Sequence, residues 1–206
     1  SPRLSWEGWA GVEGCAMVYS LFPTLPPGTL KDELDTPCFL VDLELMEQNI
    51  EKMAAYLRDR PAKLRPHMKH HKTPEIAHKQ VVAGAIGVCC QKLGEAEAMA
   101  DGGVDNILIT YEIIGETKIR RLLDLAQRVN LMVTVDDAGN VKDLSEAAQA
   151  ARVSLGILVD INCGQNRCGV DPGSPAVALA QAVARAPGLE FRGLCGYEGH
   201  LQAVVD

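Results

Sequence analysis

From residue 36 onward, short apolar runs rich in β-forming residues alternate with segments of helical periodicity. The first run, 38–41, is followed by Asp42, which is positioned to cap a helix. Apolar residues then recur with helical spacing at Met46, Ile50, Met53 and Leu57. The later runs predict strands over 63–67, 85–90, 106–110, 131–135, 154–161 and 189–197.

The segments between these strands carry residues that are typical of helix starts and helix ends. Proline just inside the start of a helix and glycine just past its end is the expected asymmetry. Thr73-Pro74 opens one helix, with Gly84 past its end, and Gly102-Gly103 closes another. Ser174-Pro175 opens a third helix, which Pro187-Gly188 ends. The chain therefore alternates strand and helix.

Strands separated by helices in this way predict right-handed βαβ units and a parallel sheet. Six strands after the opening one fit about six of the eight strands of a TIM-type (β/α)8 barrel, whose usual length is about 250 residues. An open doubly wound sheet is the alternative, but no Gly-x-Gly-x-x-Gly motif follows the first strand, which counts against a dinucleotide fold. We expect an irregular N-terminal extension over 1–28 and an incomplete barrel domain over 29–206.

Composition narrows the function classes. Apolar residues make up 47% of the chain, which is typical of a globular protein, and the net charge is −7 from 20 basic and 27 acidic residues. An acidic chain is a poor partner for nucleic acid or an anionic membrane, whereas a local basic cluster suits a small anionic ligand. No apolar run reaches membrane-spanning length and no signal-peptide pattern is present, so we expect a cytoplasmic protein.

Seven cysteines are expected to act mostly as small core residues in a reducing compartment, because most lie in apolar runs and their number is odd. Two of them, Cys163 and Cys168, have loop spacing, but no second pair completes a zinc site. The others are Cys15, Cys38, Cys89, Cys90 and Cys195.

Basic and potentially reactive side chains are concentrated in the run RPHMKHHK over residues 65–72, at the carboxyl end of a predicted strand. This edge of a parallel α/β sheet is where active sites are built. Neighbouring cations push Lys69 toward its neutral form, which is the form that attacks an aldehyde to make a Schiff base. Lys69 is therefore a candidate anchor for pyridoxal phosphate. The alternative is a solvated basic loop.

The residues after the other predicted strands also favour a cofactor site. Taken singly, Asp137 reads as a helix N-cap, Glu112 as a solvated loop residue, Arg167 as a surface charge and His200 as a rim histidine. Taken together, a lysine, a guanidinium, a histidine and amide donors on one rim are what a charged aromatic cofactor needs.

Four motifs carry a resemblance to a known family: RPHMK at 65–69, GVCCQK at 87–92 with EAE at 95–97, DINCG at 160–164 with RCGV at 167–170, and GYEGH at 196–200. With these motifs the chain resembles the alanine-racemase-fold (fold type III) pyridoxal phosphate enzymes. Within that fold it is most similar to the D-threonine aldolase, 3-hydroxy-D-aspartate aldolase and D-serine dehydratase group. The resemblance covers about residues 34 to 202.

The resemblance implies a role for each matching residue. Lys69 would hold pyridoxal 5′-phosphate and return as a base, and Arg167 would approach the phenolic oxygen of the cofactor. His200 would lie beside the pyridine ring and act in catalysis. The remaining residues would line the pocket or hold the lysine loop; they are Gln91, Tyr197, His67 and Arg65.

The resemblance also implies a reaction. The expected activity is retro-aldol cleavage of a D-3-hydroxy amino acid, D-threonine or 3-hydroxy-D-aspartate, to glycine and an aldehyde or glyoxylate. A dehydratase of D-serine or 3-hydroxyaspartate and a non-catalytic pyridoxal phosphate carrier are the alternatives.

The family pattern extends further than this sequence. A divalent metal (Mn, Mg, Co or Zn) is expected, with ligands in a C-terminal β domain outside these 206 residues, as is a homodimer. The phosphate-binding loops of the family belong to the last barrel strands. We therefore expect a truncated chain that lacks this domain, which places its own activity in question.

Overall fold

The computed structural model describes residues 25–204, and the chain divides into two compact units, Ser1–Met46 and Glu47–Asp206. In the first unit, the described residues hold a short 3-10 helix, η3 (Lys31–Glu33). Helix α1 (Leu43–Leu57) begins in this unit and ends in the second. As predicted, Asp42 caps α1, since its carboxylate accepts the backbone N–H of Leu45 at 3.0 Å. The extension predicted over 1–28 lies largely outside the described residues.

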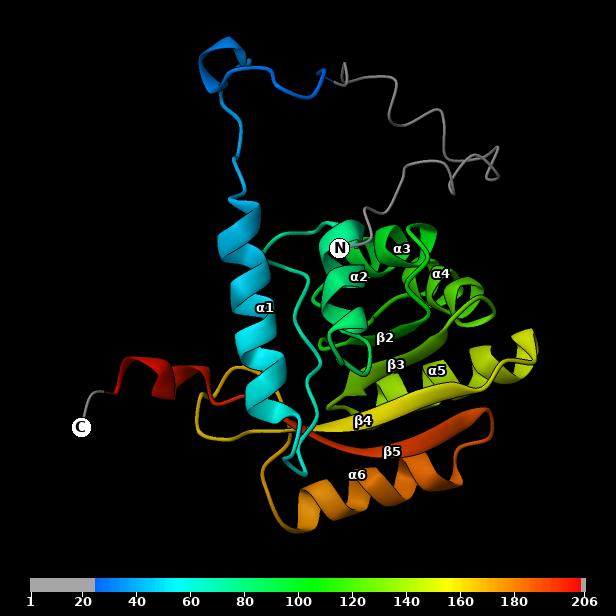
Figure 1. The fold of residues 1–206 in the computed structure, drawn as a ribbon. Coiled ribbons are helices and arrows are strands. Elements are labelled where there is room, and N and C mark those ends of the chain that lie inside the picture. The colour runs from blue at the N-terminus through cyan, green and yellow to red at the C-terminus, as the bar shows by residue number, and fades with distance from the viewer. Residues whose placement is uncertain (1–24, 205–206) are drawn as a thin grey trace. The chain divides into compact units, whose positions relative to one another are not determined.

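The second unit is a parallel α/β structure, as the sequence predicts (Figure 1). Its strands are β1 (Val88–Cys90), β2 (Asn106–Ile109), β3 (Asn130–Val135), β4 (Leu155–Ile161) and β5 (Leu189–Gly196). They pair in chain order, and every pairing is parallel. The helices are α2 (Pro74–Val82), α3 (Leu93–Asp101), α4 (Glu116–Ala126), α5 (Ala138–Ala151), α6 (Ser174–Arg185) and the short 3-10 helix η4 (Gly199–Ala203).

Two predicted strands differ from the structure. The run 63–67 forms a parallel bridge between His67 and Cys89, and the carbonyl oxygens of Leu64 and Pro66 accept the N–H groups of Ile86 and Cys89. It therefore lies along β1 without being a full strand. The strand predicted over 38–41 is wrong, because these residues are irregular and exposed. An apolar run becomes a strand only when a neighbouring strand satisfies its backbone groups, and 38–41 has no such pairing in the structure described.

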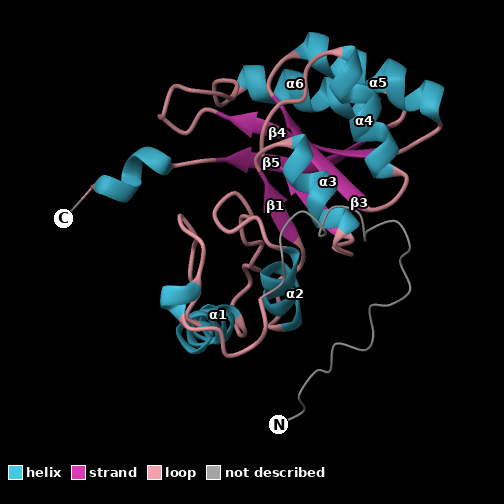
Figure 2. Ribbon diagram, turned by 90° about the horizontal axis from the view of Figure 1, so that it is seen from above, coloured by secondary structure: helices cyan, strands magenta, loops and turns pink. Residues whose placement is uncertain are grey.

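Helices α3, α4, α5 and α6 cover one face of the sheet (Figure 2). Alternate strand residues such as Ile107, Val133 and Ile157 are fully buried against them. Because side chains alternate along a strand, the residues between them face the opposite side, where a barrel has its interior. The carboxyl ends of all five strands meet at one edge, and that edge carries the residues of interest.

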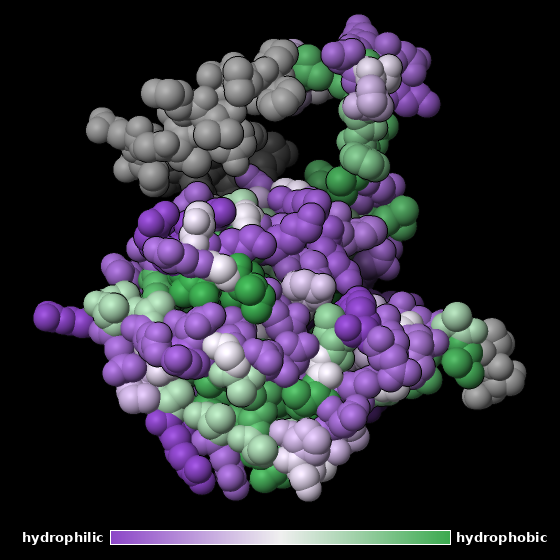
Figure 3. All heavy atoms as spheres, turned by 180° about the vertical axis from the view of Figure 1, so that it is seen from behind, coloured by the Kyte–Doolittle hydropathy of each residue, from purple (hydrophilic) through white to green (hydrophobic). Residues whose placement is uncertain are grey.

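Strand β5 has a neighbour on one side only within the described sheet. Some apolar side chains near it are consequently exposed, among them Val177 of α6 and Phe191 and Leu194 of β5. The surface seen from behind mixes such hydrophobic residues with hydrophilic ones (Figure 3). The sheet is therefore well covered in its middle and less so along β5.

Asp137 caps α5 as predicted, because its carboxylate accepts the backbone N–H of Asn140 at 3.0 Å. Replacing Asp137 with alanine is expected to lower the free energy of unfolding by about 1 kcal/mol, since one N–H at the helix start loses its acceptor. Urea unfolding measures this change. The matched control is Asp143→Ala, an exposed position within the same helix, which should leave stability nearly unchanged. Equal losses in both variants would contradict the capping role.

Candidate active site

Lys69 follows the bridge that joins His67 to β1. The backbone N–H of Met68 donates to the carbonyl oxygen of Cys89 at 2.7 Å, and the Met68 side chain is fully buried. Lys69 itself is exposed. Met68 therefore anchors the turn in the core and leaves the lysine amine free at the carboxyl edge of the sheet.

His67 supports this turn through both ring nitrogens. Its Nδ1 accepts the backbone N–H of Lys69 at 3.2 Å, and its Nε2 lies 3.2 Å from the hydroxyl of Thr110. Burial, and next the charge of Lys69, lower the pKa of His67, so the neutral ring is favoured. With Nδ1 as acceptor, the proton is on Nε2 and is donated to Thr110, whose hydroxyl donates to the carbonyl of Cys90 at 3.3 Å.

Arg65 lies at the other end of the sheet. Its guanidinium donates to the carbonyl oxygens of Val88 and Asn106, the first residues of β1 and β2, at 3.3 Å each. Burial lowers its pKa. The structure thus places Arg65 at the amino ends of these strands, where it ties them together, and does not bring its charge to the carboxyl edge expected from the sequence.

Gln91 lies just after β1, at the edge that carries Lys69. Its side chain is near enough to His67 to influence the pKa of that ring, and its backbone N–H donates to Glu95 Oε2 at 2.9 Å. The same oxygen accepts the N–H of Lys92 at 3.3 Å, and Oε1 lies 3.8 Å from Lys72 Nζ. Glu95 therefore joins the start of α3 to the lysine turn, a role that the sequence analysis did not assign.

Arg167 is in the loop between β4 and α6, and side chains within and beneath the loop hold its backbone. Asn162 Oδ1 accepts the N–H groups of Gly164 and Asn166 at 3.0 and 3.1 Å. Asp136, just after β3, accepts the N–H of Gly169 at 3.1 Å. The arginine is thus presented from a loop with fixed ends.

The ring of Tyr197 brings the lysine and arginine together. Lys69 Nζ lies 5.7 Å from the ring centroid and Arg167 Cζ lies 5.2 Å from it, both within cation–π range. Arg167 and Tyr197 also line one pocket at the end of β4, together with Asp160, Ile161, Asn162, Cys163, Gln165 and Cys168. Three sequence-predicted site residues therefore meet at one point.

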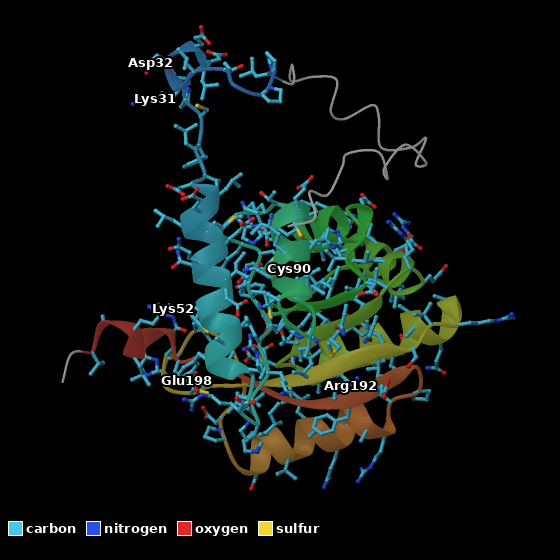
Figure 4. The ribbon with its side chains drawn as sticks, in the orientation of Figure 1. Lys31, Asp32, Lys52, Cys90, Arg192 and Glu198 are labelled. Carbon is cyan, nitrogen blue, oxygen red and sulfur yellow. The ribbon has the colours of Figure 1, made fainter. Side chains whose placement is uncertain are left out.

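His200 lies in η4, after β5 and the exposed Glu198 that Figure 4 labels. A methyl group built on Gly164 would come within 3.3 Å of His200 Nε2, so the imidazole lies against the loop that carries Arg167. Gly164 has a φ of +107° and leaves room for the ring. His200 is therefore near Arg167 in the fold, although the two come from different strands.

The interpretation of Glu112 as a solvated loop residue is wrong. Its Oε1 is buried without a hydrogen-bond partner. Burial raises the pKa of Glu112 to about 7, with repulsion from Asp136 and Asp160 adding to the rise and Arg167 opposing it. Its place after β2 was visible in the sequence, but its burial depends on strands farther along the chain.

The described cysteines are free thiols, and Cys15 lies outside the described residues. Cys90, labelled in Figure 4, is buried, whereas Cys38 and Cys163 are exposed, which differs from the expected core role. Burial raises the pKa of the Cys90 and Cys195 thiols to about 12, so both stay protonated. Across residues 25–204, no three His, Cys, Asp or Glu side chains are grouped as ligands for a metal ion.

The residues at this edge fit pyridoxal phosphate. The exposed primary amine of Lys69 and the guanidinium of Arg167 lie 5.7 and 5.2 Å from the centroid of one aromatic ring, that of Tyr197. The amine can hold an aldehyde covalently, and the guanidinium can pair with an anionic oxygen. The residues do not supply a metal site in the part of the chain that the structure describes.

Fold and site together define a parallel α/β-barrel protein with a lysine-centred site at the carboxyl ends of its strands. Residues 41–204 match the family described as alanine racemase, N-terminal domain, and the chain belongs to that family. It falls in the fold type III pyridoxal phosphate group, in agreement with the resemblance seen in the sequence, and the fold class is confirmed.

The relatives and solved structures agree with this assignment. The chain is 43% identical over 178 residues to a 3-hydroxy-D-aspartate aldolase of Paracoccus denitrificans (strain Pd 1222), covering 85% of this chain and 46% of that protein. It is 39% identical over 183 residues to a D-threonine aldolase of Arthrobacter sp., covering 89% and 48%. The crystal structure of a D-threonine aldolase from Filomicrobium marinum matches with a TM-score of 0.81 and 50% identity, covering 82% and 46%.

The chain thus spans about half the length of the curated relatives it matches. None of the helices described between residues 25 and 204 has the length and apolar character needed to span a membrane.

Proposed function

We propose that this chain carries the cofactor-binding part of a pyridoxal phosphate-dependent lyase that cleaves D-3-hydroxy amino acids by a retro-aldol reaction. The observation that carries the proposal is the convergence of Lys69 and Arg167 on the ring of Tyr197. The proposed substrates are D-threonine and 3-hydroxy-D-aspartate, after the aldolases that are 39 and 43% identical to this chain.

When bound, pyridoxal phosphate supplies an electron sink for the bond that breaks in the substrate. In the proposal Lys69 holds the cofactor through its amine and later moves a proton at that same Nζ. His67 and Gln91 keep the lysine turn in place, supported by the His67 contact to the Lys69 backbone. Arg167 would pair with the phenolic oxygen of the cofactor, Tyr197 would line the cofactor pocket, and His200 would lie on the side of the pyridine ring.

Arg65 has a different place in the proposal. Its bonds to the first residues of β1 and β2 support a role in holding the sheet under the lysine turn, at a distance from the cofactor. The divalent metal, the homodimer and the cytoplasmic location expected from the sequence belong to the same proposal for the whole protein.

A dehydratase is the second candidate, since the chain is 28% identical over 148 residues to a D-threo-3-hydroxyaspartate dehydratase of Delftia sp. (strain HT23). The two aldolases share a higher identity with this chain, which favours the aldolase.

Product analysis tests the choice. The purified chain is incubated with pyridoxal phosphate and a divalent metal, with D-threonine or 3-hydroxy-D-aspartate as substrate. We expect glycine together with an aldehyde or glyoxylate. Ammonia with a 2-oxo acid would instead establish the dehydratase, and cofactor binding without either product set would show that these 206 residues bind the cofactor without turning over substrate. Arg167→Gln is expected to lower glycine release at least about tenfold, as loss of a charge-assisted contact does.

A further inference from the structure

Three carboxyl groups lie at the ends of three successive strands, at the sheet edge that also carries the Arg167 loop. Glu112 follows β2, Asp136 follows β3, and Asp160 is near the end of β4. Asp136 holds the Arg167 loop through the N–H of Gly169 at 3.1 Å, and Asp160 lines the same pocket as Arg167. Glu112 and Asp160 each interact electrostatically with Asp136 and with Arg167. The Arg167 guanidinium therefore offsets part of the charge of Glu112 and Asp160, while Asp136 repels both of these carboxylates.

Glu112 is the member of this group whose carboxylate is least supported. Its Oε1 is buried with no hydrogen-bond partner, and the backbone N–H that favours its ionised form is its own. The other titratable groups that face Glu112 are the acids Asp136 and Asp160, the Arg167 guanidinium, the Cys195 thiol and the Tyr111 hydroxyl. A buried carboxylate oxygen without a donor is costly when charged, so protonation relieves it.

We propose that Glu112 is a positioning residue that acts through Arg167 and takes up a proton when an anionic oxygen of the cofactor binds beside that guanidinium. The inference rests on the proposed function, because it requires the cofactor at Arg167. An arriving anion shares the positive charge of Arg167 that had offset Glu112 and Asp160. Repulsion at Glu112 then grows, and its carboxylate accepts one proton from solvent to become a carboxylic acid. No other bond forms or breaks.

The sign of the pH dependence follows from this exchange. Burial raises the pKa of Glu112 to about 7, so the acid is partly protonated near neutral pH and ionised above it. Above that pH, binding of the anion requires Glu112 to take up a proton from solvent, so affinity for the anion falls as pH rises. Glu112→Gln has the shape and neutrality of the protonated side chain and should lose this part of the pH dependence.

The probe is pyridoxine 5′-phosphate, which has no aldehyde and so cannot react with Lys69. Calorimetry at about pH 7 in two buffers of different ionisation enthalpy gives the number of protons taken up on binding. We expect wild-type protein to take up a larger fraction of a proton than Glu112→Gln. Between about pH 6 and about pH 8.5, wild-type affinity should fall about tenfold more than that of the variant, the effect of a pKa rise of about one unit.

Two further variants complete the comparison. Glu112→Asp keeps a carboxyl group and should keep the proton uptake. Glu146→Gln removes a charge from an exposed pair on α5, 3.8 Å from Lys142, and should behave as wild type. Titration of the phosphate of the probe is common to every protein and cancels in the difference.

Equal proton uptake by wild type and Glu112→Gln, with thermal unfolding showing both folded, would overturn the inference. If Glu112→Gln does not fold, the wild-type measurement alone tests the inference. Proton uptake by wild type that titration of the probe fully explains would then overturn it as well. Failure of both pyridoxal phosphate and pyridoxine 5′-phosphate to bind would contradict the proposed function and this inference together. Binding without the extra proton contradicts the inference alone.

Discussion

Replacing Lys69 with alanine is expected to abolish the covalent attachment of pyridoxal phosphate at the carboxyl edge of the sheet. Lys69 is exposed, its backbone is fixed by His67, and its amine lies 5.7 Å from the ring of Tyr197. A side chain without an amine cannot form the linkage. The measurement is the visible absorption of the chain with the cofactor, followed by borohydride reduction and peptide mapping. Wild type should give one reduced adduct, at Lys69.

The matched control for this experiment is Lys142→Ala, which removes an exposed lysine from α5 and should keep the adduct. Thermal unfolding shows whether each variant folds. An adduct of undiminished yield in Lys69→Ala, or adducts scattered over surface lysines in wild type, would exclude a specific cofactor site at Lys69.

Gly169→Ala is expected to have the second largest effect, because it displaces the loop that carries Arg167. Gly169 has a φ of +91°, and a Cβ there would lie 2.6 Å from the backbone N of Asn162 and from the backbone C of Ile161. Left-handed backbone alone costs a non-glycine residue about 1–2 kcal/mol, and the overlap forces a further shift. We expect a loss of about 1–3 kcal/mol in the free energy of unfolding and cofactor binding at least about tenfold weaker, as loss of about 1.4 kcal/mol gives.

The variant Gly173→Ala distinguishes the effect of backbone strain from the effect of displacing the Arg167 loop. Gly173 has a φ of +92°, but a Cβ there would meet nothing within 4 Å. Both variants should lose stability in urea unfolding, and only Gly169→Ala should lose most of its affinity for pyridoxal phosphate. Equal affinities in the two variants would mean that the loop does not position Arg167 for the cofactor.

The sequence predicted most of the fold because its helix boundaries are set locally. Asp42 and Asp137 cap α1 and α5 through bonds to residues three positions ahead, and such spacing is visible in one dimension. The strand predicted over 38–41 failed for the opposite reason. Its apolar composition is local, but pairing with another strand is not, and composition alone does not supply a partner.

The residues of the candidate site likewise fall into those that the sequence predicted and those that depend on distant parts of the chain. Lys69 and Arg167 were predicted from their places after strands, and Tyr197 from the resemblance to the family; the parallel order of the sheet brings the three together. Glu112 was misread because its burial comes from residues that follow it at distant positions. Arg65 was expected at the wrong end of the sheet because its level is set by the pairing of His67 with Cys89, which places a residue two positions earlier beside the start of β1, and sequence spacing does not specify that pairing.

Met68 has a consequence for how this protein responds to mutation. Its fully buried side chain and its bond to Cys89 make the residue before Lys69 part of the hydrophobic core. Core packing transmits small volume changes to its neighbours. A volume change at a core position around Met68 is therefore expected to alter both the stability of the fold and the position of the Lys69 amine.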